Sequence, residues 1–151
     1  MTEHDRMKRW LGAWTGEART WLDPSKAPTV GTWTGEVTSL LDGRFIDFTY
    51  RADLGGKPHE GRLTVAFEKD EAVWRTLWVD TFHTGSAVLV SVGTERERIA
   101  VTGSYFVAGH PRWGWRTELD DARDGELVLR MFNISPEGQE DLGVEVTLRR
   151  R

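Results

Sequence analysis

Cysteine is absent from this chain of 151 residues. Its absence excludes disulfide bonds, thiol catalysis and zinc–thiolate sites. The sequence also lacks an apolar run of about 18 residues, so we expect no transmembrane helix and no membrane partner. The first ten residues carry acidic side chains and no apolar stretch, which argues against a secretory signal. The cytoplasm is therefore the default location.

An excess of positive charge is missing as well. The formal net charge is −4, and acidic and basic residues are mixed along the sequence. Proteins that bind phosphate backbones gather Lys and Arg on one face, so nucleic acid is not an expected partner. A hydrophobic fraction of 38% together with 16 glycines is ordinary for a globular protein. We expect a single domain over residues 1–151.

Tryptophan is the residue type that stands out, with eight copies against two of tyrosine. Each indole brings a large apolar surface and one N–H group that needs a partner when it is buried. The tryptophans therefore either fill a core of large side chains or line a cavity. Composition favours the core, and only their positions in the fold can decide.

One helix is expected, over residues 3–10. Thr2 is a suitable N-cap, and Asp5 stands three residues later, where it can complete a capping box. The apolar residues of this segment recur at helical spacing: Met7, Trp10 and Leu11.

Beyond the helix, apolar residues alternate with a period of two, and turn residues separate the runs. Asp42-Gly43 is the strongest hairpin signal, because both residue types accept positive φ. The predicted strands cover residues 13–21, 32–41, 44–53, 60–68, 73–82, 86–93, 98–107, 113–120, 126–134 and 141–149. An open sheet of this size would expose two edges, which closure removes. We predict an all-β fold, a single up-and-down antiparallel β-barrel with the helix closing one end; a β-sandwich is the alternative.

A barrel of ten strands has room for a cavity, and inward aromatic residues would line it. The strands at 73–82 and 126–134 carry apolar side chains on both faces, so either face can line the lumen. Their second apolar face also suggests a homodimer. The residues expected to bind a ligand are Trp33, Trp78, Asp80, His83, Tyr105, Trp113, Trp115 and Arg130.

Five stretches of the chain, in order, resemble the DUF1579 family of uncharacterised bacterial proteins: LGAWTGE, LLDGRFIDFTY, GGKPHEGRLTVAFEKD, LWVDTFHTG and EVTLRRR. The resemblance implies a lipocalin-like, or calycin, barrel and no established activity. In lipocalins and fatty-acid-binding proteins a tryptophan of the first strand stacks under a basic residue of the last. Trp14 with Arg149, Arg150 or Arg151 is the matching pair here.

Asp80 and His83 lie in WVDTFH, at the end of a predicted strand. Asp80 can orient His83 as a general base or a ligand anchor, or it can simply cap a turn beside a loop histidine. The four histidines lack the short local spacings of a metal site, so no metal is expected. Arg130, in mid-strand, would bind a carboxylate if it points inward and would be solvated if it points outward.

Haem binding is a further possibility, because nitrobindin barrels share the pattern GxWxG that Gly12–Gly16 matches. Those proteins supply the axial histidine from the C-terminal part of the barrel. Residues 111–151 contain no histidine, so we expect no haem and no other cofactor.

The leading hypothesis is a protein that binds a small hydrophobic or amphipathic molecule in a cavity lined by indoles. The alternatives are a barrel enzyme that uses Asp80 and His83 for acid–base chemistry, and a homodimeric interaction module. The repeated stretch WTGE, at residues 14–17 and 33–36, fits two successive strands. The direction in which Trp33 points is the open question.

Overall fold

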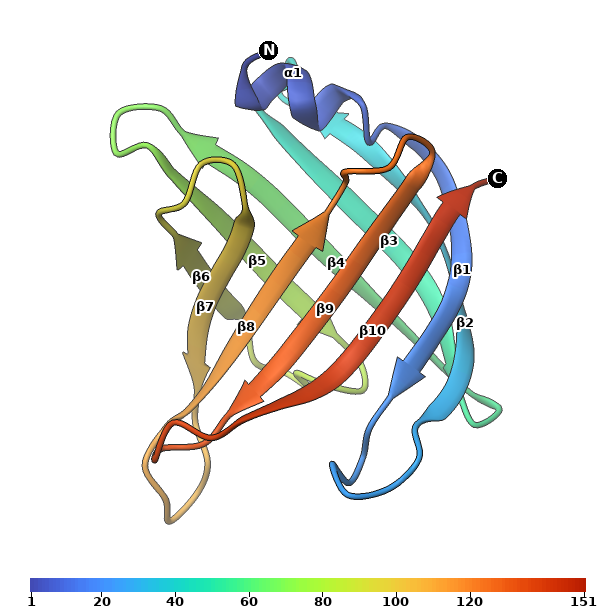
Figure 1. Ribbon diagram of the computed structural model, residues 1–151, viewed down its shortest axis with the longest axis vertical. Helices are drawn as coiled ribbons and strands as arrows, with labels where there is room; N and C mark the ends of the chain where they lie inside the picture. Colours follow the sequence, from blue (N-terminus) through green and yellow to red (C-terminus); the bar gives the residue numbers. More distant parts are fainter.

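Ten antiparallel strands close into one barrel, and a short helix lies across one end (Figure 1). The computed structural model describes residues 1–151. Successive strands are neighbours, and β1 pairs with β10 to close the barrel, which confirms the predicted fold class. The elements are α1 (Glu3–Lys8), β1 (Gly12–Thr20), β2 (Thr29–Leu40), β3 (Phe45–Leu54), β4 (Lys57–Glu68), β5 (Val73–Asp80), β6 (Leu89–Gly93), β7 (Ile99–Tyr105), β8 (Trp113–Asp120), β9 (Glu126–Ile134) and β10 (Glu140–Arg150).

Helix α1 begins with the expected capping box, in which Thr2 and Asp5 exchange hydrogen bonds between side chain and backbone. The helix ends at Lys8, two residues earlier than predicted, and a turn carries the chain on through Trp10. Met7 and Trp10 are buried against the barrel end. No helix of the structure is long and apolar enough to cross a membrane.

The strands at 113–120 and 126–134 have the predicted bounds, and most others differ by a few residues at their ends. The predicted strand 73–82 is wrong at its end, because β5 stops at Asp80. The Asp80 carboxylate accepts hydrogen bonds from the backbone N–H groups of Phe82 and His83, which turns the chain out of the sheet. The next strand, predicted from residue 86, begins only at Leu89.

Burial settles which faces of β5 and β9 are inward. Trp74, Thr76, Trp78 and Asp80 of β5 and Leu127, Leu129 and Met131 of β9 are buried. On the outer face of β9, the guanidinium of Arg116 lies 4.4 Å from the ring centroid of Phe132. On the outer face of β5, Leu77 remains exposed. A homodimer through these strands stays a prediction.

The two WTGE stretches pair with each other across β1 and β2. Trp14 lies opposite Gly35, and Trp33 lies opposite Gly16. Both indoles point inward and are 1% exposed. A Cβ added at Gly16 would lie 1.7 Å from the carbonyl oxygen of Thr147 on β10, so the glycine permits close approach of the neighbouring strand. The repeat is one structural device used twice.

The closing pair predicted for the barrel end is present. The guanidinium of Arg150 lies 4.5 Å from the ring centroid of Trp14. Arg150 also donates a hydrogen bond to the carbonyl oxygen of Leu11, at 2.8 Å. The indole N–H of Trp14 donates to the carbonyl oxygen of Trp10, at 2.7 Å. The cation–π contact joins the first and last strands, and the two hydrogen bonds tie this pair to the segment that covers the barrel end.

Side chains fill the middle of the barrel. A void toward the helix end measures about 30 Å³ and has an entirely hydrophobic lining, which includes Trp10, Phe48 and Leu129. Such a space holds little more than one water molecule. The space expected inside the barrel is therefore not here. A larger cavity is lined by residues of the β5–β6 and β7–β8 loops. Both loops lie at the end opposite α1 (Figure 1).

Candidate functional site

The open end of the barrel holds a cavity of about 510 Å³, within the range of small-molecule sites. Seven of its 11 lining residues are hydrophobic. The lining consists of Trp78, His83, Thr84, Ala87, Val88, Leu89, Ser104, Tyr105, Phe106, Arg112 and Trp115. Four of the residues predicted to bind a ligand thus line one cavity: Trp78, His83, Tyr105 and Trp115.

Aromatic rings build one wall of this cavity. The rings of Trp78 and Trp115 are stacked with centroids 5.6 Å apart. Tyr105 meets Trp115 edge-on at 6.5 Å, and His83 packs against Trp78 at 5.2 Å. The hydroxyl of Tyr105 donates to the side-chain oxygen of Asn133, at 2.6 Å. The wall comes from β5, β7 and β8, so the sheet itself holds it in place.

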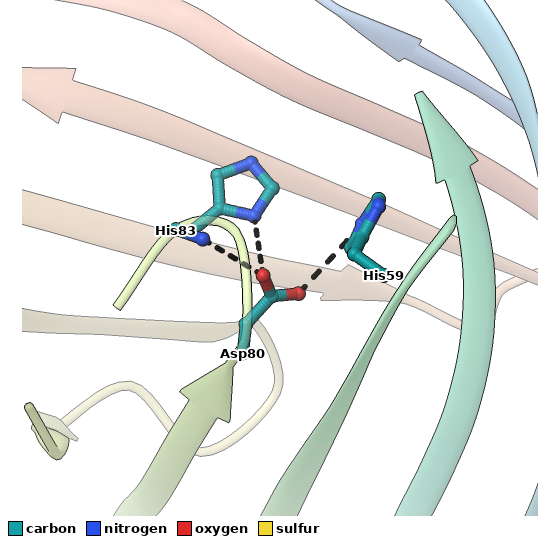
Figure 2. Close-up of side chains that lie close together, drawn as sticks. All are labelled: His59, Asp80 and His83. Atoms are coloured by element: carbon teal, nitrogen blue, oxygen red, sulfur yellow. Dashed lines mark hydrogen bonds and ion pairs between the residues drawn. The ribbon is translucent and has the colours of Figure 1, made fainter. Parts of the chain in front are cut away.

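Asp80, the last residue of β5, is buried and lies next to His83 and His59 (Figure 2). Its Oδ1 accepts hydrogen bonds from the backbone N–H of His83, at 2.8 Å, and from the ring Nδ1 of His83, at 3.1 Å. Its Oδ2 accepts the hydroxyl of Tyr50. Burial raises the pKa of Asp80, but the hydrogen bonds from His83 and Tyr50 outweigh it and hold the pKa at about 2. Asp80 is ionised at neutral pH.

Tyr50, which donates to Asp80, is itself held by two aromatic neighbours. The indole N–H of Trp78 donates to the Tyr50 hydroxyl oxygen at 2.9 Å, and Trp33 stacks on the Tyr50 ring with centroids 3.8 Å apart. Burial, and then the charge of Asp80, raise the pKa of Tyr50, which stays protonated and donates. The direction of Trp33, which the sequence left open, is therefore inward. Trp33 packs on Tyr50 and does not line the cavity.

His59, on β4, is the site residue that sequence reasoning missed. Its Nε2 lies 3.8 Å from Oδ2 of Asp80, too far for a hydrogen bond (Figure 2). Burial lowers the pKa of His59, although the charge of Asp80 opposes that shift. The strand alternation could have revealed this residue. Position 59 shares the inward face with Leu63, and the β4–β5 register places Gly61 opposite Asp80.

Several polar atoms at this end are buried without a hydrogen-bond partner. They are Nδ1 and Nε2 of His59, Nε2 of His83 and Nε1 of Trp115. An ionised carboxylate only accepts, so Nδ1 of His83 carries the proton that it shares with Asp80. In the neutral ring, Nε2 of His83 is then a free acceptor, while Nε1 of Trp115 is a free donor.

Two predicted ligand-binding residues lie elsewhere. Arg130 is on the outer face of β9, where its Nε donates to Glu145 at 3.0 Å. Successive side chains of a strand point to opposite faces. Since Met131 points into the core, its neighbour Arg130 points outward. Trp113 is partly buried beside Tyr105 in the β7–β8 register but is not part of the cavity lining.

Comparison with known proteins places the chain in a family. The model of the family described as "Protein of unknown function (DUF1579)" matches residues 1–150. No curated protein matches the sequence. Among solved structures, the chain is similar to the crystal structure of Rv2717c from M. tuberculosis, with 13% identity and a TM-score of 0.65. That alignment covers 100% of this chain and 99% of that chain, and at this identity it shows the fold alone.

Proposed function

We propose that this chain, which belongs to the DUF1579 family, binds a small amphipathic molecule in the cavity at the open end of its barrel. We also propose that the barrel is a calycin of the lipocalin type, a proposal that the Trp14–Arg150 closure supports. The lack of cysteine favours the cytoplasm as its location.

The observation that carries the binding proposal is a pair of buried nitrogens without a partner, Nε2 of His83 and Nε1 of Trp115, in two residues of the aromatic cavity wall. Leaving a buried donor or acceptor without a partner costs about 1–3 kcal/mol. The rings of His83 and Trp115 both line the cavity, with centroids 6.2 Å apart, and we propose that one ligand group meets both nitrogens. A hydroxyl does so, because it accepts from the indole N–H and donates to Nε2 of His83. The favoured ligand is therefore an apolar molecule with one hydroxyl group.

Two probes of similar size test this proposal: para-cresol, which has a hydroxyl, and para-xylene, which has a methyl group in its place. The indole N–H signals of the chelator-treated protein are followed by NMR during titration. We expect para-cresol to bind at least about tenfold more tightly, because one hydrogen bond contributes about 1 kcal/mol and the unpartnered atoms add to that. The Trp115 signal should move most.

The matched variants are Trp115→Phe and Trp113→Phe, on the same strand. Trp115→Phe keeps an aromatic ring but loses the N–H, and should abolish the preference for para-cresol. Trp113→Phe should leave the preference unchanged. Equal binding of the two probes by the unaltered protein, or a preference that survives Trp115→Phe, would refute the assignment.

A second candidate function is acid–base catalysis in the same cavity. Asp80 holds the Nδ1 proton of His83, and the free Nε2 belongs to a residue that lines the cavity. In this arrangement Nε2 can take a proton from a bound hydroxyl or water while Asp80 stabilises the imidazolium. Hydrolysis of para-nitrophenyl butyrate tests it. His83→Gln should lose the activity and His110→Gln, in an exposed loop, should keep it; equal rates in both variants would reject catalysis by His83.

A further inference from the structure

Three side chains cluster on the side of the His83 imidazole that faces Asp80. His59 comes from the start of β4, Asp80 from the end of β5 and His83 from the turn that follows (Figure 2). One ligand atom from each residue can be chosen so that all three lie within 4.8 Å of one another. The three side chains are 6%, 0% and 11% exposed, respectively. Chain segments that are separate in sequence thus converge on one small volume.

We propose that His59, Asp80 and His83 bind a divalent transition-metal ion. The nitrogens of His59 are buried and have no hydrogen-bond partner, and Nε2 faces the Asp80 carboxylate. A histidine buried in this way is rare, because buried polar atoms almost always have a partner. A metal ion between His59 and Asp80 supplies that partner.

The separations of the ligand atoms fit such an ion. Two ligands of a tetrahedral zinc ion lie about 3.4 Å apart, because each bond measures about 2.0–2.1 Å. The distance from Nε2 of His59 to Oδ2 of Asp80 is 3.8 Å, and that from Nδ1 of His83 to Oδ1 of Asp80 is 3.1 Å. These two pairs use different carboxylate oxygens, and one atom from each residue can be chosen within 4.8 Å of the others, so rotation of the imidazoles is needed to bring all three ligands onto one ion.

The carboxylate is already oriented by its other hydrogen bonds. The hydroxyl of Tyr50 donates to Oδ2, and the backbone N–H groups of Phe82 and His83 donate to Oδ1. Such outer hydrogen bonds fix the direction of metal ligands. The metal replaces only the bond between Nδ1 of His83 and Asp80. The ring proton then resides on Nε2, so metal binding also changes the hydrogen-bonding character of the cavity wall.

The ligand set selects the class of metal. Two imidazoles and one carboxylate suit zinc or ferrous iron, whereas calcium and magnesium require mostly oxygen ligands. Three protein ligands leave at least one coordination position for water or a substrate atom. The site is distinct from the amphipathic-ligand site, although both use the ring of His83.

Titration of the tag-free, chelator-treated protein with zinc chloride tests the proposal by calorimetry, and cobalt(II) serves as a visible-absorption probe. We expect one ion per chain. His59→Gln should weaken binding by more than about 100-fold, since even the loss of an outer hydrogen bond costs about 10–100-fold. Tyr50→Phe should weaken binding about tenfold, and His110→Gln should leave it unchanged.

A second measurement does not depend on the folding of a variant. Zinc added to the unaltered protein should shift the ring C–H NMR signals of His59 and His83 and leave those of His110 in place. The proposal is overturned if zinc does not bind, if binding survives His59→Gln, or if the shifts appear at His4 and His110 instead. The calorimetric result is independent of the para-cresol titration, so either proposal can fail alone.

Discussion

Each end of the barrel buries one aspartate near its mouth, and the two aspartates have different surroundings. At the helix end, Asp121 accepts hydrogen bonds from Nε and Nη2 of Arg6, at 2.8 and 2.6 Å, and from the indole N–H of Trp10, at 2.8 Å. At the open end, Asp80 is also well bonded, but Nε2 of His59 beside it has no hydrogen-bond partner. Nε2 of His83 has none either.

The residues that contact the two aspartates also differ in charge. Arg6 is permanently charged and binds Asp121 through two bonds, a geometry suited to a structural ion pair. Burial raises the pKa of Asp121, and the hydrogen bonds from Arg6 and Trp10 outweigh it, so the pKa lies below its usual value. His59 and His83, in contrast, can change protonation or bind a metal. The helix end therefore carries a structural ion pair, whereas four buried polar atoms without a partner gather at the open end, against one, Nδ1 of His4, in the helix.

The largest difference in the free energy of unfolding is expected between variants that remove the basic neighbour of each aspartate, Arg6 at Asp121 and His59 at Asp80. Arg6→Leu leaves Asp121 as an unpaired buried charge and should lower the free energy of unfolding by about 3 kcal/mol. His59→Leu removes no hydrogen bond, so the metal-free protein should change by less than about 1 kcal/mol, in either direction. Urea unfolding with a chelator present measures both. Equal losses in the two variants would mean that His59 is as structural as Arg6.

A smaller difference is expected from removing one indole N–H at each end. Trp10→Phe loses a bond to a carboxylate, and such bonds contribute about 1.5–3 kcal/mol, whereas Trp115→Phe loses an N–H that has no partner. Both changes remove the same ring volume. Trp10→Phe should therefore destabilise the protein by about 2 kcal/mol more, measured by urea unfolding. A Trp115→Phe variant as unstable as Trp10→Phe would show that its N–H has a partner in solution.

The smallest effect is expected at acid pH. Because the pKa of Asp121 is lower in the folded than in the unfolded state, its contribution to stability is present above the unfolded value, about 3.9. That contribution is lost as the pH falls through the folded value. In Asp121→Asn the free energy of unfolding should therefore decline less steeply below about pH 4 than in the unaltered protein. Urea midpoints measured across this pH range give both declines. If the two proteins lost stability in parallel, the Arg6–Asp121 ion pair would not contribute to the pH dependence.

Most of the barrel follows from sequence periodicity. Alternation of apolar and polar residues predicted the bounds of β8 and β9, because one face of each strand packs inside and the other faces out. The same pattern does not predict the end of β5, because Phe82 continues the alternation beyond Asp80. There the Asp80 carboxylate accepts a hydrogen bond from the backbone N–H of Phe82 and ends the strand, and no periodicity contains that information.

The site was only partly predictable for a related reason. Asp80 and His83 are neighbours in sequence, so a local motif marked them. His59 joins them only through the register of β4 against β5, which is a long-range property. The size of the cavity also depends on packing. A ten-stranded barrel could have been hollow, but large side chains such as Trp10, Phe48 and Leu129 fill much of its interior.

The most direct test of the contrast between the two ends is a crystal structure of the protein purified from its native host. Our account requires non-solvent density in the cavity of about 510 Å³, within hydrogen-bond distance of Nε2 of His83 and Nε1 of Trp115. It also requires unchanged contacts between Arg6, Trp10 and Asp121. A cavity that holds only disordered water, with His83 and Trp115 bonded to other protein atoms, would contradict the assignment of the open end as a binding site.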